Sequence, residues 1–253
     1  VQDAGKDVFH GELITRPQIR VSHPISGRIP EAKDKPAKHL MEHEKTLFFE
    51  RMMFLMEIPS LSRSVNGGTM NLSVGGVRSY HQDNLYSRRS AHKLTIFVGY
   101  VNCVCTNLMV SVDGMLDQLR ASEASFVRSR SVNLLHDFDG DEQLNRYADW
   151  NLVHMSEQQF AEFVGRSRMY HHLPKREKAE LPKMEFSDTL LNQVVSGFYK
   201  DIHFGRSEDG SISLWNLFNL LTGANRSSYV DKIVHRSINA SEIVSNIEQY
   251  VKS

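Results

Sequence analysis

The pattern of apolar residues changes once along this chain, and that change restricts the fold more than any single motif. Between residues 46 and 121, short apolar runs are separated by glycine-rich turn signals, which is typical of antiparallel strands. From about residue 123 to 251, apolar residues instead recur with helical spacing. Strands that precede helices, rather than alternating with them, indicate an α+β fold. We therefore expect an antiparallel β-sheet in the N-terminal half and a helical C-terminal half packed on it.

The β-rich half contains one strong hairpin signal, Asn66-Gly67-Gly68. Asn and Gly adopt the positive φ angles of tight hairpin turns, so this signal predicts that two strands pair on either side of it. The paired glycines Gly75-Gly76 predict a bulge or bend within the second strand. The expected strands are Thr46–Pro59 continued through Leu61–Val65, Thr69–Val74, Val77–Tyr80, Leu94–Ser111 as one strand or two, and Met115–Ala121 after an Asp113-Gly114 turn.

The helical half carries recognisable start and stop signals. Ser156 with Gln159 forms a capping-box pattern and predicts a helix that runs to about His171. Ser187 and Ser213 are predicted to cap two further helices, because a serine oxygen can accept a hydrogen bond from a free N–H at a helix start. Gly223 is predicted to end the second of these as a C-cap glycine. Ser227 and Ser228 open a last amphipathic segment, which extends through Val251.

The first 38 residues differ from the rest of the chain. Pro17, Pro24, Pro30 and Pro36 all lie there, out of seven prolines in the whole sequence. Proline cannot donate to a strand ladder or continue a helix, so we expect an extended arm. The predicted organisation is an arm over 1–38 and a single α+β domain over 39–253, with a β-rich part at 46–121 and a helical part at 123–251.

Composition is that of an ordinary globular protein, with a formal net charge of zero. Residues 1–93 hold 14 Lys and Arg against 10 Asp and Glu, and residues 94–253 hold 16 against 20, so an anion-binding face is expected in the N-terminal part. No apolar run approaches the ~20 residues that span a bilayer, and no signal-peptide pattern is present. We expect a cytoplasmic protein with no membrane partner. The two cysteines, Cys103 and Cys105, are interpreted as reduced, buried thiols.

Three motifs resemble catalytic or metal sites without completing them. His39, Glu42 and His43 match the H-x-x-E-H pattern of inverted zinc peptidases, but no third ligand is evident, so a charged surface turn is favoured. The segments 137–141 and 208–213 imitate parts of calcium loops, with glycine or the closing glutamate misplaced, and are interpreted as acidic turns. The sequence therefore predicts no catalytic residue, no metal ligand and no cofactor.

The connection over 78–93 is the best candidate for binding. It combines basic and aromatic side chains with a single aspartate. Basic groups neutralise phosphates and aromatic rings stack on unpaired bases, so this mixture is suited to single-stranded nucleic acid. A solvated basic loop without a ligand is the alternative. The candidate nucleic-acid-binding residues are Arg78, Tyr80, Tyr86, Arg88, Arg89 and Lys93.

A stripe of amides marks the apolar segment 213–225. Asn216 and Asn219 lie one helical turn apart, and the strand segment offers matching amides at Asn102 and Asn107. Asparagine is costly to bury without hydrogen-bond partners, so these amides require an explanation. We expect a structural clamp between the strand and the helix, beside Trp215. A polar pocket lined by Asn216 and Asn219 is the alternative.

Two segments resemble a known family. Residues 101–108 are similar to the V-C-x-N-x-L strand of the bacterial phage/plasmid-like proteins, and 214–225 resemble their W-x-x-x-N-x-x-T helix. The closer resemblance, over about 19–240, is to the family called domain of unknown function 3871. It is carried also by Val21-Ser-His-Pro24, by the segment from Glu42 to Leu47, by Gly75-Gly76-Val77-Arg78 and by Asn84-Leu-Tyr-Ser87.

This resemblance implies a protein carried by plasmids, conjugative elements or phages, and it brings no activity, cofactor or site residue. Together with the basic connection, it favours a non-enzymatic nucleic-acid-associated module, either a single-strand binder or an accessory of replication or recombination. The alternative is a protein-interaction module that acts on host machinery. A metal-dependent hydrolase that uses His39, Glu42 and His43 is the least favoured reading.

Overall fold

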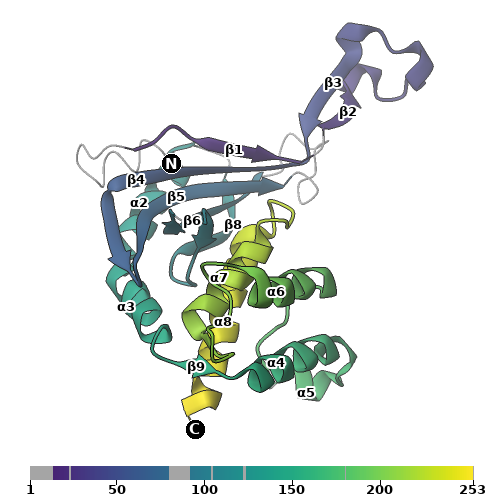
Figure 1. The fold of residues 1–253 in the computed structure, drawn as a ribbon. Coiled ribbons are helices and arrows are strands. Elements are labelled where there is room, and N and C mark those ends of the chain that lie inside the picture. Colours follow the sequence, from purple (N-terminus) through teal and green to yellow (C-terminus); the bar gives the residue numbers. More distant parts are fainter. Residues whose placement is uncertain are drawn as a thin grey trace.

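A computed structural model describes residues 14–22, 24–79, 92–103, 105–121, 124–179 and 181–252. Its N-terminal half is an antiparallel sheet and its C-terminal half is helical, so the predicted α+β fold is confirmed (Figure 1). The main sheet has the order β1-β4-β5-β6-β7, and β8 pairs with β6 beyond the end of β7. Its strands are β1 (Gln18–Val21), β4 (Arg51–Val65), β5 (Gly68–Ser79), β6 (His92–Asn102), β7 (Asn107–Met109) and β8 (Met115–Ala121).

The turn between β4 and β5 forms where the sequence predicts it. Val65 pairs with Gly68, and the two residues between them, Asn66 and Gly67, have φ angles of 51° and 75°. These positive angles match the right-handed twist of the strands. The Asn66 side chain also donates to the carbonyl oxygen of Tyr147 at 2.8 Å, which fastens this end of the hairpin to the helical half.

The predicted bulge at Gly75-Gly76 is wrong, because β5 runs without interruption and the irregularity lies in β4. The register shifts between Ile58 and Ser62, where Pro59 cannot donate to a ladder. The glycines serve close packing instead. A Cβ atom on Gly75 would lie 2.3 Å from the carbonyl oxygen of Phe54 and 2.5 Å from the ring of Phe97.

A second, smaller hairpin projects from the body. It pairs β2 (Pro24–Arg28) with β3 (Lys45–Phe49), and the chain between them passes through three short 3-10 turns (Figure 1). Part of the segment expected to be an extended arm thus forms strands, since β1 lies on the edge of the main sheet and β2 in this hairpin. Residue 38, the predicted boundary, lies inside the 3-10 turn Ala37–His39.

The caps of the helical half follow the sequence in part. The Ser156–Gln159 capping box is present, and the Ser213 hydroxyl accepts a hydrogen bond from the Asn216 N–H at 3.1 Å. Ser187 stands at the start of its helix but makes no side-chain cap bond. The helical half comprises α2 (Ala124–Asp137), α3 (Gly140–Trp150), α4 (Glu157–Met169), α5 (Lys175–Ala179), α6 (Asp188–Lys200), α7 (Leu214–Asn225) and α8 (Ile233–Lys252), with the short strands β9 (His154–Met155) and β10 (Ile212–Ser213).

The prediction that Gly223 ends its helix is wrong. The α7 helix continues to Asn225, and the φ angle of Gly223 is not in the left-handed region. A Cβ atom at this position would lie 3.6 Å from the side-chain amide of Asn107, which is an ordinary van der Waals contact.

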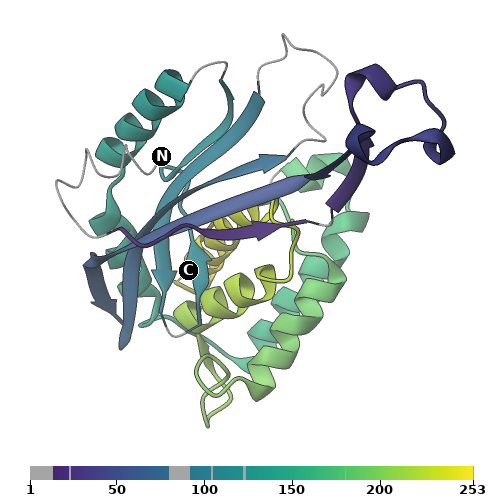
Figure 2. The same ribbon diagram turned by 90° about the horizontal axis from the view of Figure 1, so that it is seen from above.

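Two apolar clusters join the halves. On one face of the sheet, Met53, Val77 and Phe97 pack against Ile233 and Val234 of α8. The larger cluster contains the other sheet face together with α3, α6 and α7. The helices α7 and α8 lie beneath the sheet when it is seen from above (Figure 2).

Candidate nucleic-acid interface

The described part of the predicted basic connection lies at one end of the main sheet. Arg78 is next to last in β5 and Lys93 is second in β6, and Arg78 is paired in register with Leu94. The two candidate residues therefore flank the segment 80–91 on neighbouring strands. Tyr80, Tyr86, Arg88 and Arg89 lie outside the described residues.

The strand register adds two basic residues that sequence reasoning missed. Lys93 pairs with Arg120 of β8, and Arg51 of β4 pairs with Ser79. Directly paired residues of antiparallel strands lie on the same face of a sheet, so Arg78, which pairs with Leu94, is on the face opposite to Lys93. Arg120 stands in a strand that the sequence did predict, but only the register of β6 with β8 pairs it with Lys93. We call Arg51, Arg78, Lys93 and Arg120 the basic end of the sheet.

An exposed tyrosine lies beside this basic end. The Arg51 guanidinium carbon lies 4.6 Å from the ring centroid of Tyr229, whose side chain is 65% exposed. Arg51 Nε also lies 3.2 Å from the Asp231 carboxylate, and the two groups attract each other as an ion pair without a well-aligned hydrogen bond. This pair fixes the segment before α8 at the end of the sheet. Asp231 offsets the charge of Arg51.

Three of the four predicted clamp amides meet between the sheet and α7. The Asn102 side chain donates to Asn219 Oδ1 at 3.2 Å, and the Asn107 side chain donates to the Asn219 carbonyl oxygen at 3.1 Å. The Asn219 amide donates in turn to the Trp215 carbonyl oxygen at 2.9 Å. All three asparagines are 1% exposed. At this depth the amides leave no room for a ligand, so the arrangement fastens the β6–β7 turn to the helix.

The other two predicted members of this cluster have different surroundings. Asn216 is half-buried and donates to the Gly205 carbonyl oxygen at 3.4 Å, in the loop that precedes β10. The Trp215 ring packs against Tyr147 and Phe218 in the core, with ring centroids 5.4 and 6.2 Å away. Trp215 thus contributes its backbone carbonyl to the clamp, while its ring supports α3.

The C-x-C segment lies at the turn between β6 and β7. Cys103 is exposed and Cys105 is half-buried, so the expectation of two buried thiols is wrong for Cys103. Burial raises the pKa of both thiols, and for Cys105 the nearby Arg226 opposes this increase only in part. A raised pKa keeps the thiols protonated, and so weakly nucleophilic, near neutral pH.

The incomplete catalytic motifs form no metal site. His39 ends one 3-10 turn while Glu42 and His43 begin another, so no single helix aligns them, and Glu42 pairs with Lys45. Among the described residues, no three His, Cys, Asp or Glu side chains are grouped closely enough to hold a metal ion.

The two acidic segments act as turns. Asp139 accepts a hydrogen bond from the Glu142 N–H at 3.0 Å and caps α3. Asp209 accepts from both the N–H and the hydroxyl of Ser211, and these hydrogen bonds lower the pKa of its carboxyl group.

The fold and this site define an α+β protein in which Arg51, at the basic end of the sheet, contacts the segment that precedes α8. The chain belongs to the family described as "Domain of unknown function, B. Theta Gene description (DUF3871)", whose model matches residues 1–252. The family was predicted from the segments quoted above, and that prediction is confirmed.

Similarity to proteins of known structure or role is slight. The "Probable potassium transport system protein Kup" of Lactobacillus delbrueckii subsp. bulgaricus is 26% identical over 159 residues. The similarity covers 60% of this chain and 23% of that protein, so the chain spans about a quarter of its length. None of the described helices is long and apolar enough to cross a membrane. No solved structure matches the chain.

Proposed function

We propose that this protein is a single-stranded nucleic-acid-binding module that uses the basic end of its sheet. The observation that carries the proposal is the register pairing of Lys93 with Arg120, at the same end of the sheet as Arg51 and the exposed ring of Tyr229. The similarity of 101–108 and 214–225 to phage/plasmid-like proteins supports a role as a replication or recombination accessory of a mobile element.

The chemistry of this surface suits an unpaired strand better than a duplex. Cations placed along neighbouring strands can follow a phosphate backbone, and each phosphate contact releases counterions to the solvent. A tyrosine ring that is exposed on one side offers a stacking surface, which requires a base whose own faces are free. The Arg51 guanidinium lies over the Tyr229 ring and fixes its position before any base arrives.

The test measures the fluorescence anisotropy of a labelled oligothymidylate over a series of salt concentrations. The Lys93→Ala/Arg120→Ala variant should reduce the slope of log affinity against log salt by about 1.4, since each phosphate contact on a single strand contributes about 0.7. Tyr229→Ala should weaken binding by about 1–3 kcal/mol and leave the slope unchanged, because it removes stacking and no charge.

The matched control is Lys175→Ala/Arg176→Ala. It removes the same two charges from α5, an exposed helix that does not touch the main sheet. If the two double variants reduce the slope of log affinity against log salt equally, the binding is a general effect of net charge. The absence of any salt-dependent binding by the full chain would refute the proposal.

A further inference from the structure

A cavity of about 300 Å³ lies between α4 and the C-terminal half of α8. Phe163, Ser167 and Tyr170 line it from one side with the i, i+4, i+7 spacing of a single helical face. From α8, Ile243 and Ile247 line the other side one turn apart. Two apolar stripes thus face each other with space between them, although stripes of this kind normally pack directly together.

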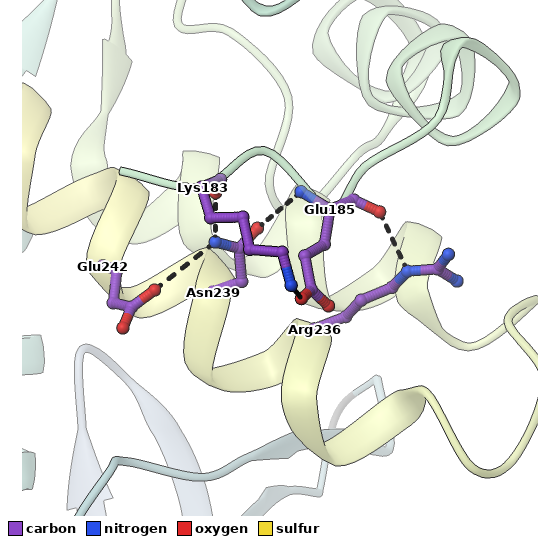
Figure 3. A network of polar contacts seen from close by, with 5 residues as sticks. All are labelled: Lys183, Glu185, Arg236, Asn239 and Glu242. Atoms are coloured by element: carbon purple, nitrogen blue, oxygen red, sulfur yellow. Dashed lines mark hydrogen bonds and ion pairs between the residues drawn. The ribbon is translucent and has the colours of Figure 1, made fainter. Parts of the chain in front are cut away.

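The segment 181–184 forms a third wall, and it is held firmly. The Asn239 side chain of α8 accepts a hydrogen bond from the Glu185 N–H at 3.0 Å and donates to the Lys183 carbonyl oxygen (Figure 3). Arg236 Nε donates to the Glu185 carbonyl oxygen at 3.0 Å. Leu181 and Met184 therefore face the cavity from a fixed position. The wall cannot collapse inward without breaking these bonds, so the cavity is pre-formed.

Ser167 is the most deeply buried polar residue of a lining that also includes Gln159 and Asn246. Ser167 is 4% exposed, and its hydroxyl makes no hydrogen bond with any residue that the structure describes. The Ser167 oxygen is not cut off from solvent, so a ligand that offers one donor or acceptor would take the place of water there. Specific small-molecule sites commonly have this composition, with mostly apolar walls and a few polar groups that fix the orientation.

Charge and size restrict the ligand further. The charged residues at the cavity, Arg166 and Glu162, form an ion pair with each other at 2.7 Å and offer no net charge. The volume is about twice that of an engineered cavity of ~150 Å³ that binds benzene. We propose that this cavity binds a neutral aromatic molecule of about two fused rings, oriented by one hydrogen bond to Ser167. The site is separate from the basic end of the sheet and does not depend on the function proposed there.

Indole is the probe, and the full chain labelled with ¹³C at its methionine methyl groups is the reporter. Saturable chemical-shift changes are expected at Met155 and Met184, which line the cavity. Met70 and Met109, which are fully buried in the sheet core, should not respond. Shifts that spread over all four methyl groups, or no saturable shift at Met155 and Met184, would overturn the proposal. In that case the groove is a contact surface for another chain.

Two variants test the orientation and the location of the bound molecule. Ser167→Ala should weaken indole binding about fivefold and leave binding of indene, which lacks the N–H, unchanged. Ile247→Phe should abolish binding of both molecules, since the larger ring occupies the cavity from a half-buried position that tolerates the change. Unaltered Met70 and Met109 signals verify that each variant is folded. Wild-type affinity for indole in Ile247→Phe would contradict the location, and equal loss of indole and indene in Ser167→Ala would contradict the hydrogen bond.

Discussion

Ser237 provides the sharpest test of how the helical half holds the sheet. This fully buried residue of α8 accepts a hydrogen bond from the Val110 N–H at 2.9 Å and donates to the Leu108 carbonyl oxygen at 2.9 Å. Leu108 and Val110 are two residues apart at the outer edge of the main sheet. The Leu108 carbonyl oxygen and the Val110 N–H point away from β6, and such groups would normally form hydrogen bonds with a further strand. The serine hydroxyl takes the place of that strand.

Ser237→Ala should therefore lower the free energy of unfolding by about 2–6 kcal/mol, because each of two buried backbone groups loses its partner at a cost of about 1–3 kcal/mol. Leu108 and Val110 are 7% and 0% exposed, so bulk water does not replace the lost bonds. In a domain of this size the melting temperature should fall by about 4–24 °C. The volume removed is a single oxygen atom, so loss of packing contributes little.

The assay is urea unfolding followed by circular dichroism, where the midpoint should fall while the slope with denaturant stays constant. Ser241→Ala is the matched control. Ser241 lies one turn further along α8, is 7% exposed, and makes no side-chain hydrogen bond to the described residues. This control should change stability by less than about 0.5 kcal/mol. If Ser237→Ala and Ser241→Ala lower the free energy of unfolding equally, the loss comes from replacing a serine in α8 and not from the hydrogen bonds to the sheet edge. That result would refute the reasoning.

Two further predictions concern the sheet and its turn. Gly75→Ala should destabilise the protein by at least about 1–3 kcal/mol, measured by the same urea assay, because the new methyl group would overlap the Phe54 carbonyl and the Phe97 ring. Alkylation of Cys105 by iodoacetamide should be slower at pH 7.5 than that of an unstructured cysteine peptide, and the ratio should approach one only at pH values above the ordinary thiol pKa, since burial raises the pKa of this thiol. Equal rates at pH 7.5 would contradict that account.

Local signals were enough to predict the order of elements. The Asn66-Gly67 turn, the Ser156 capping box and the Ser213 cap all depend on bonds between residues at most three positions apart. A pattern of residue types over such a distance defines the geometry almost completely. For this reason the α+β class and most turns could be predicted without the structure.

Features that depend on distant pairing could not be predicted. Gly75 was predicted to form a bulge, yet it is small because Phe54 and Phe97 approach it, and Gly223 was predicted to be a cap although its helix continues to Asn225. Likewise Asn216 and Asn219 are both amides on α7. Their side chains do not point in the same direction, because three residues span less than one full turn of 3.6 residues. Asn219 consequently faces the β6–β7 turn while Asn216 faces the loop at Gly205.

The position of β8 suggests how a bound polyanion would be oriented. One end of this strand carries Arg120, paired with Lys93 at the basic end of the sheet. The other end follows Asp113, in a groove that Asp137, Asp139, Glu142 and Glu242 also line, where Arg146 is already paired with Glu142.

The seven residues of β8 separate these regions by about 20 Å, which exceeds the screening length of roughly 8 Å at physiological ionic strength. The basic end therefore attracts a nearby anionic ligand, and the acidic groove repels it, with little influence of one region on the other. A strand bound at Arg120 would be repelled if it continued along β8 towards the groove, so we expect it to leave the sheet across β5 and β4, towards Arg51.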